Sequence, residues 1–231
     1  MGTHDDYILQ VSDLNVKLQD RAILENVSFK VKRGTTLAIV GPNGAGKSVL
    51  FRALLNLIPY TGKIEWAEGV RIGYVPQKLS VTDIPISVRE FLSFKKSSDI
   101  KESLGAVGLD DASIMDRALG VLSGGQLQRV LIAWAIVDQP DVLLFDEPTT
   151  GVDLDSEEAI YEMVNGLEKD HGITVLLISH DVHIIRDYSE YMLALNRNVI
   201  CFAESEEITD SSVLHAIYGP GTTLKKRKDK R

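Results

Sequence analysis

Cysteine and long apolar runs are scarce in this sequence. Cys201 is the single cysteine among 231 residues, so the chain can form neither an internal disulfide nor a thiolate cage for a metal. No segment approaches the roughly 18 apolar residues that a membrane-spanning helix needs. Residues 1–6 are polar and acidic, and no apolar stretch resembling a signal peptide follows them. We therefore expect a protein of a reducing cytoplasm that does not cross a membrane by itself.

Positive charge is also scarce, except near the end of the chain. The formal net charge is -8, although six of the seven residues in 225–231 are basic, so the remainder is more acidic than the total. Surfaces that bind nucleic acids are usually basic, because they displace counterions from phosphates. We expect no nucleic-acid partner. We interpret the basic tail, residues 222–231, as a solvated chain end, with contact to anionic lipid or RNA as the alternative.

The remaining composition is that of a soluble globular protein, with 44% hydrophobic and 25% charged residues. A length of 231 residues is large for one α/β unit, so we expect one core with an inserted lobe. Alternation of apolar and polar residues predicts antiparallel strands over 8–16 and 22–31. Apolar runs predict buried strands, and helical spacing predicts helices, over these ranges: strands 37–40, 71–75, 142–145 and 174–178; helices 49–58, 127–137, 157–167 and 183–188.

The alternation of these strands and helices predicts an α/β fold with a mostly parallel sheet and helices on its faces. Residues 87–122 are more polar and have helical apolar stripes, as in a helical lobe. We expect a single domain over 1–231, with a core of about 1–79 and 140–220 and a lobe of about 80–139. The helix after Ser123 should begin there, because serine is a favourable N-cap residue.

A glycine-rich segment, GPNGAGKS, lies between the strand predicted over 37–40 and the helix that follows. Glycines let backbone N–H groups surround phosphates that a Cβ would obstruct, and the helix adds its positive end. Lys47 is expected to neutralise the β- and γ-phosphates, and the Ser48 hydroxyl to bind Mg²⁺. The segment therefore predicts a nucleotide-binding P-loop with these cofactor-binding residues: Gly41, Pro42, Asn43, Gly44, Ala45, Gly46, Lys47 and Ser48.

Two carboxylates follow the apolar run 142–145. Next to a P-loop, Asp146 fits the carboxylate that holds the magnesium ion as a second ligand after Ser48, directly or through water. Glu147 is suited to polarise the attacking water. Without the P-loop, Glu147 would be interpreted as a solvated acid at a strand end.

His180 follows the strand predicted over 174–178, at the sheet edge where the phosphates are expected. An imidazole there could hold the γ-phosphate and orient the water together with Glu147. His180 and His183 also form an H-x-x-H pair. We do not interpret this pair as a metal site, because no third ligand lies nearby in the sequence.

The order and spacing of GPNGAGKS, Gln77, LSGGQ, VLLFDE and His180 closely resemble those of ABC ATPase subunits over nearly the whole chain. The resemblance implies a P-loop NTPase (RecA-like) core with a mostly parallel sheet, an N-terminal antiparallel β subdomain and an inserted helical subdomain. It implies ATP and Mg²⁺ as cofactors. It also implies catalytic roles for Glu147 and His180, a place for Gln77 in the magnesium or water network, and a loop around Asp153 that contacts a second subunit.

In that family two subunits pack head to tail, and each ATP lies between the P-loop of one and the LSGGQ signature of the other. The signature here includes Ser123, Gly124, Gly125 and Gln126. The free N–H groups at the start of the following helix can bind a γ-phosphate. The resemblance therefore implies a homodimer.

A narrower resemblance, in residues 72–94 and 149–221, is to zinc- and manganese-uptake ATPases. It implies uptake of a divalent metal, zinc first and manganese next, through a separate membrane permease and with an extracytoplasmic metal-binding protein. The subunit would then be peripheral, at the cytoplasmic face of the membrane. The alternatives are an ABC transporter for another substrate and a soluble ABC ATPase such as an iron-sulfur assembly factor.

Three positions depart from the family's usual residues. Leu18 stands where an aromatic residue usually stacks on adenine, so either base selectivity is weak or Tyr7 substitutes. Trp134 stands where the signature helix usually carries arginine. Val49 replaces a common threonine, while the expected magnesium ligand Ser48 is kept.

Overall fold

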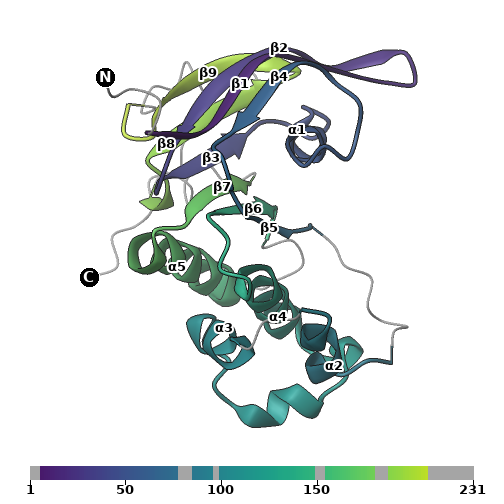
Figure 1. Ribbon diagram of the computed structural model, residues 1–231, viewed down its shortest axis with the longest axis vertical. Helices are drawn as coiled ribbons and strands as arrows, with labels where there is room; N and C mark the ends of the chain where they lie inside the picture. The colour runs from purple at the N-terminus through teal and green to yellow at the C-terminus, as the bar shows by residue number, and fades with distance from the viewer. Residues whose placement is uncertain (1–5, 78–84, 96–98, 149–153, 180–186, 208–231) are drawn as a thin grey trace.

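The computed structural model describes residues 6–77, 85–95, 99–148, 154–179 and 187–207. An antiparallel sheet of three strands, in the order β2-β1-β4, forms the top of the molecule in Figure 1. Strands β1 (Tyr7–Leu18) and β2 (Arg21–Lys32) contain the two segments that alternation predicts. The sequence pattern does not predict β4 (Thr61–Trp66), because its side chains are exposed or half-buried along its whole length. The N-terminal antiparallel β subdomain is confirmed.

The second sheet has six strands in the order β5-β6-β7-β3-β8-β9, and the first five in this order are parallel. The mostly parallel sheet is therefore confirmed. The strands predicted from the sequence do not include the last two, which form an antiparallel hairpin at one edge. The strand bounds are β3 (Thr36–Val40), β5 (Ile72–Val75), β6 (Val142–Asp146), β7 (Thr174–Ile178), β8 (Tyr191–Asn196) and β9 (Asn198–Glu204).

The six-stranded sheet is a middle layer between two hydrophobic cores. Along β6, Val142 and Leu144 pack with the antiparallel sheet and helix α1 (Lys47–Leu54). Leu143 and Phe145 point the other way, toward α4 (Gly124–Ile136) and α5 (Leu154–His171). Burial on both faces explains why the parallel strands are continuous apolar runs rather than alternating ones.

Helix α1 is shorter than the predicted helix over 49–58. It ends at Leu54, and Asn56 has a left-handed backbone with φ of 56°. A residue in this conformation ends a helix, and Pro59 reinforces the stop. Helices α4 and α5 contain the predicted ranges 127–137, except for the C-cap Val137, and 157–167. Of the helix predicted over 183–188, residues 183–186 lie outside the described residues.

The helical lobe extends from the sheet to the bottom of Figure 1. It consists of short elements that pack on α4: α2 (Val88–Ser93), α3 (Ile100–Ala106) and the 3₁₀ helices η1 (Ala112–Asp116) and η2 (Leu119–Val121). Trp134 of α4 stacks on Phe91 with ring centroids 5.6 Å apart, and Lys95 Nζ lies 4.3 Å from the Trp134 ring centroid. Trp134 therefore acts as a packing residue between α2 and α4.

Candidate functional site

The P-loop is held closely from behind by the hairpin of β8 and β9. A Cβ at Gly41 would lie 2.0 Å from the carbonyl oxygen of Leu195, so only glycine fits there. The Ala45 carbonyl accepts a hydrogen bond from the Arg197 N–H at 3.0 Å. The sequence gives no signal for this support, because it joins residues about 150 positions apart.

The start of α1 is fixed from the opposite side by β2. Gly46 is its N-cap, with a left-handed φ of 99°, and a Cβ there would lie 2.6 Å from Leu24 Cδ2. The Glu25 N–H donates to the Arg197 carbonyl at 2.8 Å, which joins β2 to the hairpin behind the P-loop. The loop is thus preorganised to present its backbone N–H groups to phosphates.

Lys47 lies along the P-loop with its side chain 6% exposed. Its Nζ donates to the carbonyl oxygens of Gly41 at 2.8 Å and Pro42 at 3.2 Å, and lies 3.9 Å from Glu147 Oε1. Burial lowers the pKa of Lys47, against the raising effect of Glu147 and Asp146. A partly desolvated ammonium with few fixed anionic contacts is suited to receive a polyphosphate.

Ser48 and Asp146 lie in direct contact although they are 98 residues apart in sequence. Ser48 Oγ donates to Asp146 Oδ1 at 3.0 Å, and the Tyr74 hydroxyl lies 3.5 Å from Asp146 Oδ2. Burial raises the pKa of Asp146, and neighbouring Glu147 raises it further. Tyr74 is a site residue that the sequence analysis missed. It occupies a half-buried position in β5 and has no motif around it.

Glu147 follows β6 with an unusual left-handed φ of 48°. Its N–H donates to the carbonyl of Ile178 at 3.1 Å, which holds the ends of β6 and β7 together. Gln77, just beyond β5, donates from Nε2 to Glu147 Oε2. A non-glycine residue in this conformation is strained, and such strain is common at functional sites. The predicted carboxylate and the predicted glutamine therefore lie together.

The LSGGQ segment forms the start of α4. Ser123 is the N-cap, as predicted, and its hydroxyl accepts from the Gln126 N–H at 3.2 Å. Gln126 Oε1 accepts from the Ser123 N–H at 3.2 Å, which completes a capping box. The side chains of Ser123 and Gln126 thus define where the helix begins, and the first-turn N–H groups at Gly124 and Gly125 point along its axis.

Three further predictions concern the edges of this site. His180, His183 and Asp153 lie outside the described residues, so their positions stay predictions.

Tyr7 pairs with Lys32 at one end of the β1–β2 hairpin, whereas Leu18 pairs with Arg21 at the other. The P-loop contacts the Leu18 end through Leu24, so the alternative in which Tyr7 replaces the adenine-stacking residue is wrong.

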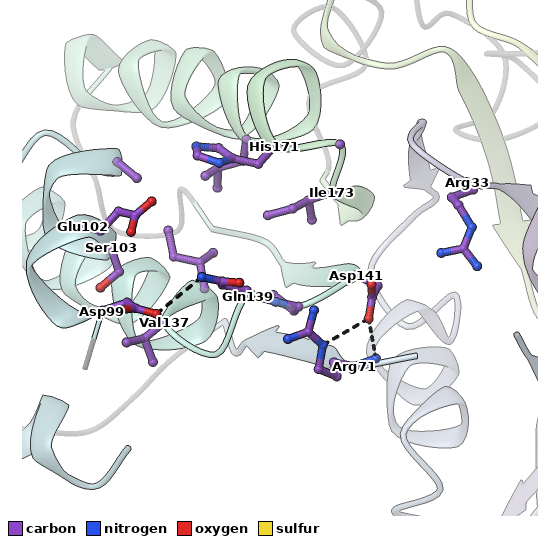
Figure 2. Close-up of a pocket in the computed structure, with 15 residues that line it drawn as sticks. Arg33, Arg71, Asp99, Glu102, Ser103, Val137, Gln139, Asp141, His171 and Ile173 are labelled. Atoms are coloured by element: carbon purple, nitrogen blue, oxygen red, sulfur yellow. Dashed lines mark hydrogen bonds and ion pairs between the residues drawn. The ribbon is translucent and has the colours of Figure 1, made fainter. Parts of the chain in front are cut away.

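A separate cavity of about 290 Å³ lies at the opposite edge of the sheet, where β5, β6 and β7 begin (Figure 2). Arg71 and Asp141 form an ion pair there, with Nε and Oδ2 3.4 Å apart. Gln139 donates to Asp99 Oδ2 at 3.4 Å across the gap to α3. The P-loop, Asp146 and Glu147 lie at the other ends of the strands, so this cavity is separate from the predicted phosphate site.

The sequence pattern of the ABC transporter family matches residues 24–150, more than half of the chain. The chain belongs to the ABC transporter family. A zinc import ATP-binding protein of Photorhabdus laumondii is 38% identical over 217 residues, covering 92% of this chain and 84% of the relative. Its counterpart in Ruegeria pomeroyi is 37% identical over 220 residues, with 93% and 85% covered.

Solved structures agree with this assignment. A structure described as a metal-chelate type ABC transporter in an inward-facing conformation superposes with a TM-score of 0.83, at 28% identity, covering 92% of this chain and 89% of that one. The P-loop NTPase fold with its antiparallel and helical additions is therefore confirmed. Membership of the ABC transporter family makes the chain an ATP-binding ATPase, so the expected nucleotide is confirmed.

Two features are absent from the described part of the chain. Within the ranges that the structure describes, no helix is both long and apolar enough to cross a bilayer. The same ranges contain no group of three or more histidine, cysteine or acidic side chains arranged to hold a metal ion.

Proposed function

We propose that this chain is the ATP-hydrolysing subunit of an importer that takes up a divalent metal ion, zinc first and manganese next, through a separate membrane permease. The catalytic part rests on the meeting of four side chains from two segments of the chain: Lys47 and Ser48 at the start of α1, and Asp146 and Glu147 at the end of β6. The relatives' name as zinc import ATP-binding proteins supports the choice of ion.

The roles proposed for these residues follow from their chemistry. Lys47 and the N–H groups of the P-loop bind the β- and γ-phosphates. The lysine is fixed at the loop, and the backbone N–H groups are already oriented, so binding requires little reorganisation of the protein. Glu147 accepts the proton of the attacking water, and Gln77 holds that carboxylate in place. His180 contacts the γ-phosphate from the end of β7, and Asp153 contacts the partner subunit.

The oxygen groups near the P-loop fit a magnesium ion. Ser48 Oγ and Asp146 Oδ1 are 3.0 Å apart, and a hydroxyl with a carboxylate is a donor set that Mg²⁺ prefers. Ser48 and Asp146 would hold the ion, with the amide oxygen of Gln77 as a further ligand. When bound, the ion neutralises charge on the phosphate oxygens.

The position of the signature supports a head-to-tail homodimer. The Ala135 carbonyl, near the end of α4, is close enough to β5 that a Cβ at Gly73 would lie 2.7 Å from it. Ser123 lies twelve residues earlier, about 18 Å away along the helix axis. The exposed start of α4 therefore lies far from the sheet, where a second chain's ATP can reach it.

We infer that the subunit sits at the cytoplasmic face of the membrane as a peripheral protein, bound to permease subunits. The permease would receive the ion from an extracytoplasmic metal-binding protein. The transported ion would bind the permease and the metal-binding protein rather than this chain. Transport therefore requires no cluster of metal-binding side chains in the described part of this chain.

The catalytic role of Glu147 is tested with Glu147→Gln, which keeps the shape of the side chain and removes its charge. We expect kcat for ATP hydrolysis to fall at least about 100-fold, while ATP binding stays within a few-fold of the original chain. Glu65→Gln, on exposed β4, is the control and should hydrolyse ATP normally. Normal turnover by Glu147→Gln would show that another group is the base.

The transport role is tested by isolating the complex from membranes and measuring uptake in vesicles. We expect a multi-span permease to accompany the chain, and zinc uptake to require ATP and Glu147. Uptake of manganese instead of zinc would change the ion and keep the mechanism. A soluble scaffold as the sole companion, with uptake of neither ion, would contradict the transport proposal.

A further inference from the structure

Both carboxyl oxygens of Asp146 are in contact with a hydroxyl group. Ser48 Oγ donates to Oδ1 at 3.0 Å, and the hydroxyl of Tyr74 in β5 donates to Oδ2 at 3.5 Å. Asp146 is only 4% exposed, so water has little access to replace either hydroxyl. The Tyr74 contact is at the long end of the hydrogen-bond range, so its strength depends on how firmly the ring is held.

The ring of Tyr74 is held by the same helix that carries Ser48. Phe51 of α1 is fully buried, and its ring meets that of Tyr74 edge to face, with centroids 6.5 Å apart and an interplanar angle of 83°. Ser48 and Phe51 are three residues apart, so they lie on the same side of α1. One helix therefore sets the position of both hydroxyl groups that contact Asp146.

Strand β5 is also fixed against β6, which ends at Asp146. The two strands pair in parallel, with Tyr74 beside Leu144, and the side chains of Leu144 and Asp146 alternate onto the same face of β6. Gln77, three residues after Tyr74, donates to Glu147. The end of β5 thus provides one contact to each of the two neighbouring carboxylates.

We propose that Tyr74 is a positioning residue that holds Oδ2 of Asp146, so that Oδ1 stays directed toward Ser48. This inference rests on the proposed binding of a magnesium ion by Ser48 and Asp146. The terminal torsion of an aspartate is broad, so an unrestrained carboxylate presents its oxygens in many orientations. Mg²⁺ requires near-ideal octahedral geometry. The Tyr74 hydroxyl restricts the carboxylate in advance, which lowers the entropy cost of binding the ion.

The test uses Tyr74→Phe in the full-length chain, which removes the hydroxyl and keeps the ring against Phe51. The measured quantity is the dissociation constant of mant-ADP, a fluorescent ADP analogue, in EDTA and in excess Mg²⁺. The constant in EDTA divided by that in Mg²⁺ reports the contribution of the ion without any turnover. We expect Tyr74→Phe to reduce this ratio about fivefold, the factor that a hydrogen bond of ordinary strength contributes. The constant in EDTA should stay within about twofold.

Tyr191→Phe is the matched control. Tyr191 is a half-buried tyrosine at the start of β8, and its hydroxyl accepts from Lys32 Nζ at 2.7 Å. It pairs with Leu37 at the end of the sheet away from the P-loop. We expect its ratio to equal that of the original chain. If Tyr74→Phe behaves like this control, or weakens mant-ADP binding equally in EDTA and in Mg²⁺, the positioning role is wrong.

Asp146→Asn separates this inference from the function on which it rests. If Asp146→Asn keeps the full ratio, the proposed role of Asp146 with the ion fails. If Asp146→Asn loses the ratio and Tyr74→Phe keeps it, the role of Asp146 stands and the positioning role of Tyr74 fails. We expect Tyr74→Phe to change the ratio no further in the Asp146→Asn chain, because both act through one carboxylate. A further loss in the double variant would contradict the positioning role.

Discussion

At the scale of single residues, two aspartates at opposite ends of strand β6 have opposite electrostatic environments. Asp146 lies at the phosphate edge, where burial and then Glu147 raise the pKa of its carboxyl group. Asp141 lies at the other edge, where the Arg71 backbone N–H lowers the pKa of its carboxyl group despite partial burial. One charge opposes folding and the other supports it.

The sign of each contribution follows from the direction of the shift. The folded protein disfavours the charged form of Asp146. The stability of the fold therefore decreases as pH rises from the unfolded pKa of this carboxyl group, about 3.9, through its raised folded pKa. The contribution of Asp141 is present above the unfolded pKa and is lost as pH falls through its lowered pKa. The cost at Asp146 is consistent with a carboxylate kept for binding a cation.

We predict that Asp146→Asn stabilises the nucleotide-free protein at pH 7 and abolishes hydrolysis. The thermal midpoint should rise by about 2–4 °C, the change that 1 kcal/mol produces in a domain of this size. The hydrolysis rate should fall at least about 100-fold, because the charge proposed to hold the magnesium ion is lost. Calorimetry and an ATPase assay measure the two effects.

The same substitution at Asp141 is the control. Asp141→Asn should lower the thermal midpoint at pH 7 and leave the hydrolysis rate unchanged, because it removes a favourable charge far from the phosphates. A fall in midpoint for both variants would show that the charge of Asp146 does not oppose folding.

At the scale of elements, helices α2 and α4 begin with the same device. Ser87 and Glu90 form a capping box at α2, and Ser123 and Gln126 form one at α4. The Ser87 N–H and hydroxyl lower the pKa of Glu90, so that box depends on pH. Gln126 has no charge to lose. The signature helix therefore keeps its start at any pH that the fold tolerates.

The paired boxes separate the structural role of the signature serine from its role with nucleotide. Ser87→Ala and Ser123→Ala should each destabilise the protein by about 1 kcal/mol, as the loss of an N-cap usually does. We expect only Ser123→Ala to reduce ATP hydrolysis, by about tenfold or more, because the phosphate-facing helix start is disturbed there. Equal losses of activity in Ser87→Ala and Ser123→Ala would show that destabilising the helical lobe is enough to reduce hydrolysis, without a separate role for Ser123 at the nucleotide.

At the scale of the whole molecule, the signature and the P-loop would be the two halves of a composite site in the proposed homodimer. The signature lies at the exposed end of α4, while the P-loop is enclosed between β2 and the hairpin of β8 and β9. A head-to-tail pair places each half against the complementary half of the other chain. This arrangement predicts that defects in the two halves complement each other when they are on different chains.

We predict that a mixture of Lys47→Ala and Ser123→Arg chains recovers hydrolysis that neither variant shows alone. A mixed dimer has one site with an intact P-loop and an intact signature, so equal mixing restores about one quarter of the original sites. The control is a chain with both substitutions, which should recover nothing with either single variant. No recovery in the first mixture would contradict the composite site.

Much of this protein is determined by short-range sequence chemistry. The P-loop needs its glycines within eight residues, Asp146 ends a buried strand with Glu147 directly after it, and Ser123 caps the helix that it precedes. These features are predictable because each depends on neighbours in the chain. Strands β4 and β9 were not predicted, because partly exposed edge strands show weak alternation and take their definition from partners elsewhere. Strand β8 was also missed, although it is a buried apolar run between β3 and β9.

Tertiary structure alone decided which distant residues complete the site. Tyr74 reaches Asp146 across 72 positions, and Leu195 limits Gly41 to glycine from the far end of the chain. It also rejected Tyr7 as an adenine platform, because the register of β1 and β2 places it at the wrong end of the hairpin. Strand order and register bring such residues together, and neither is encoded in the spacing of any local motif.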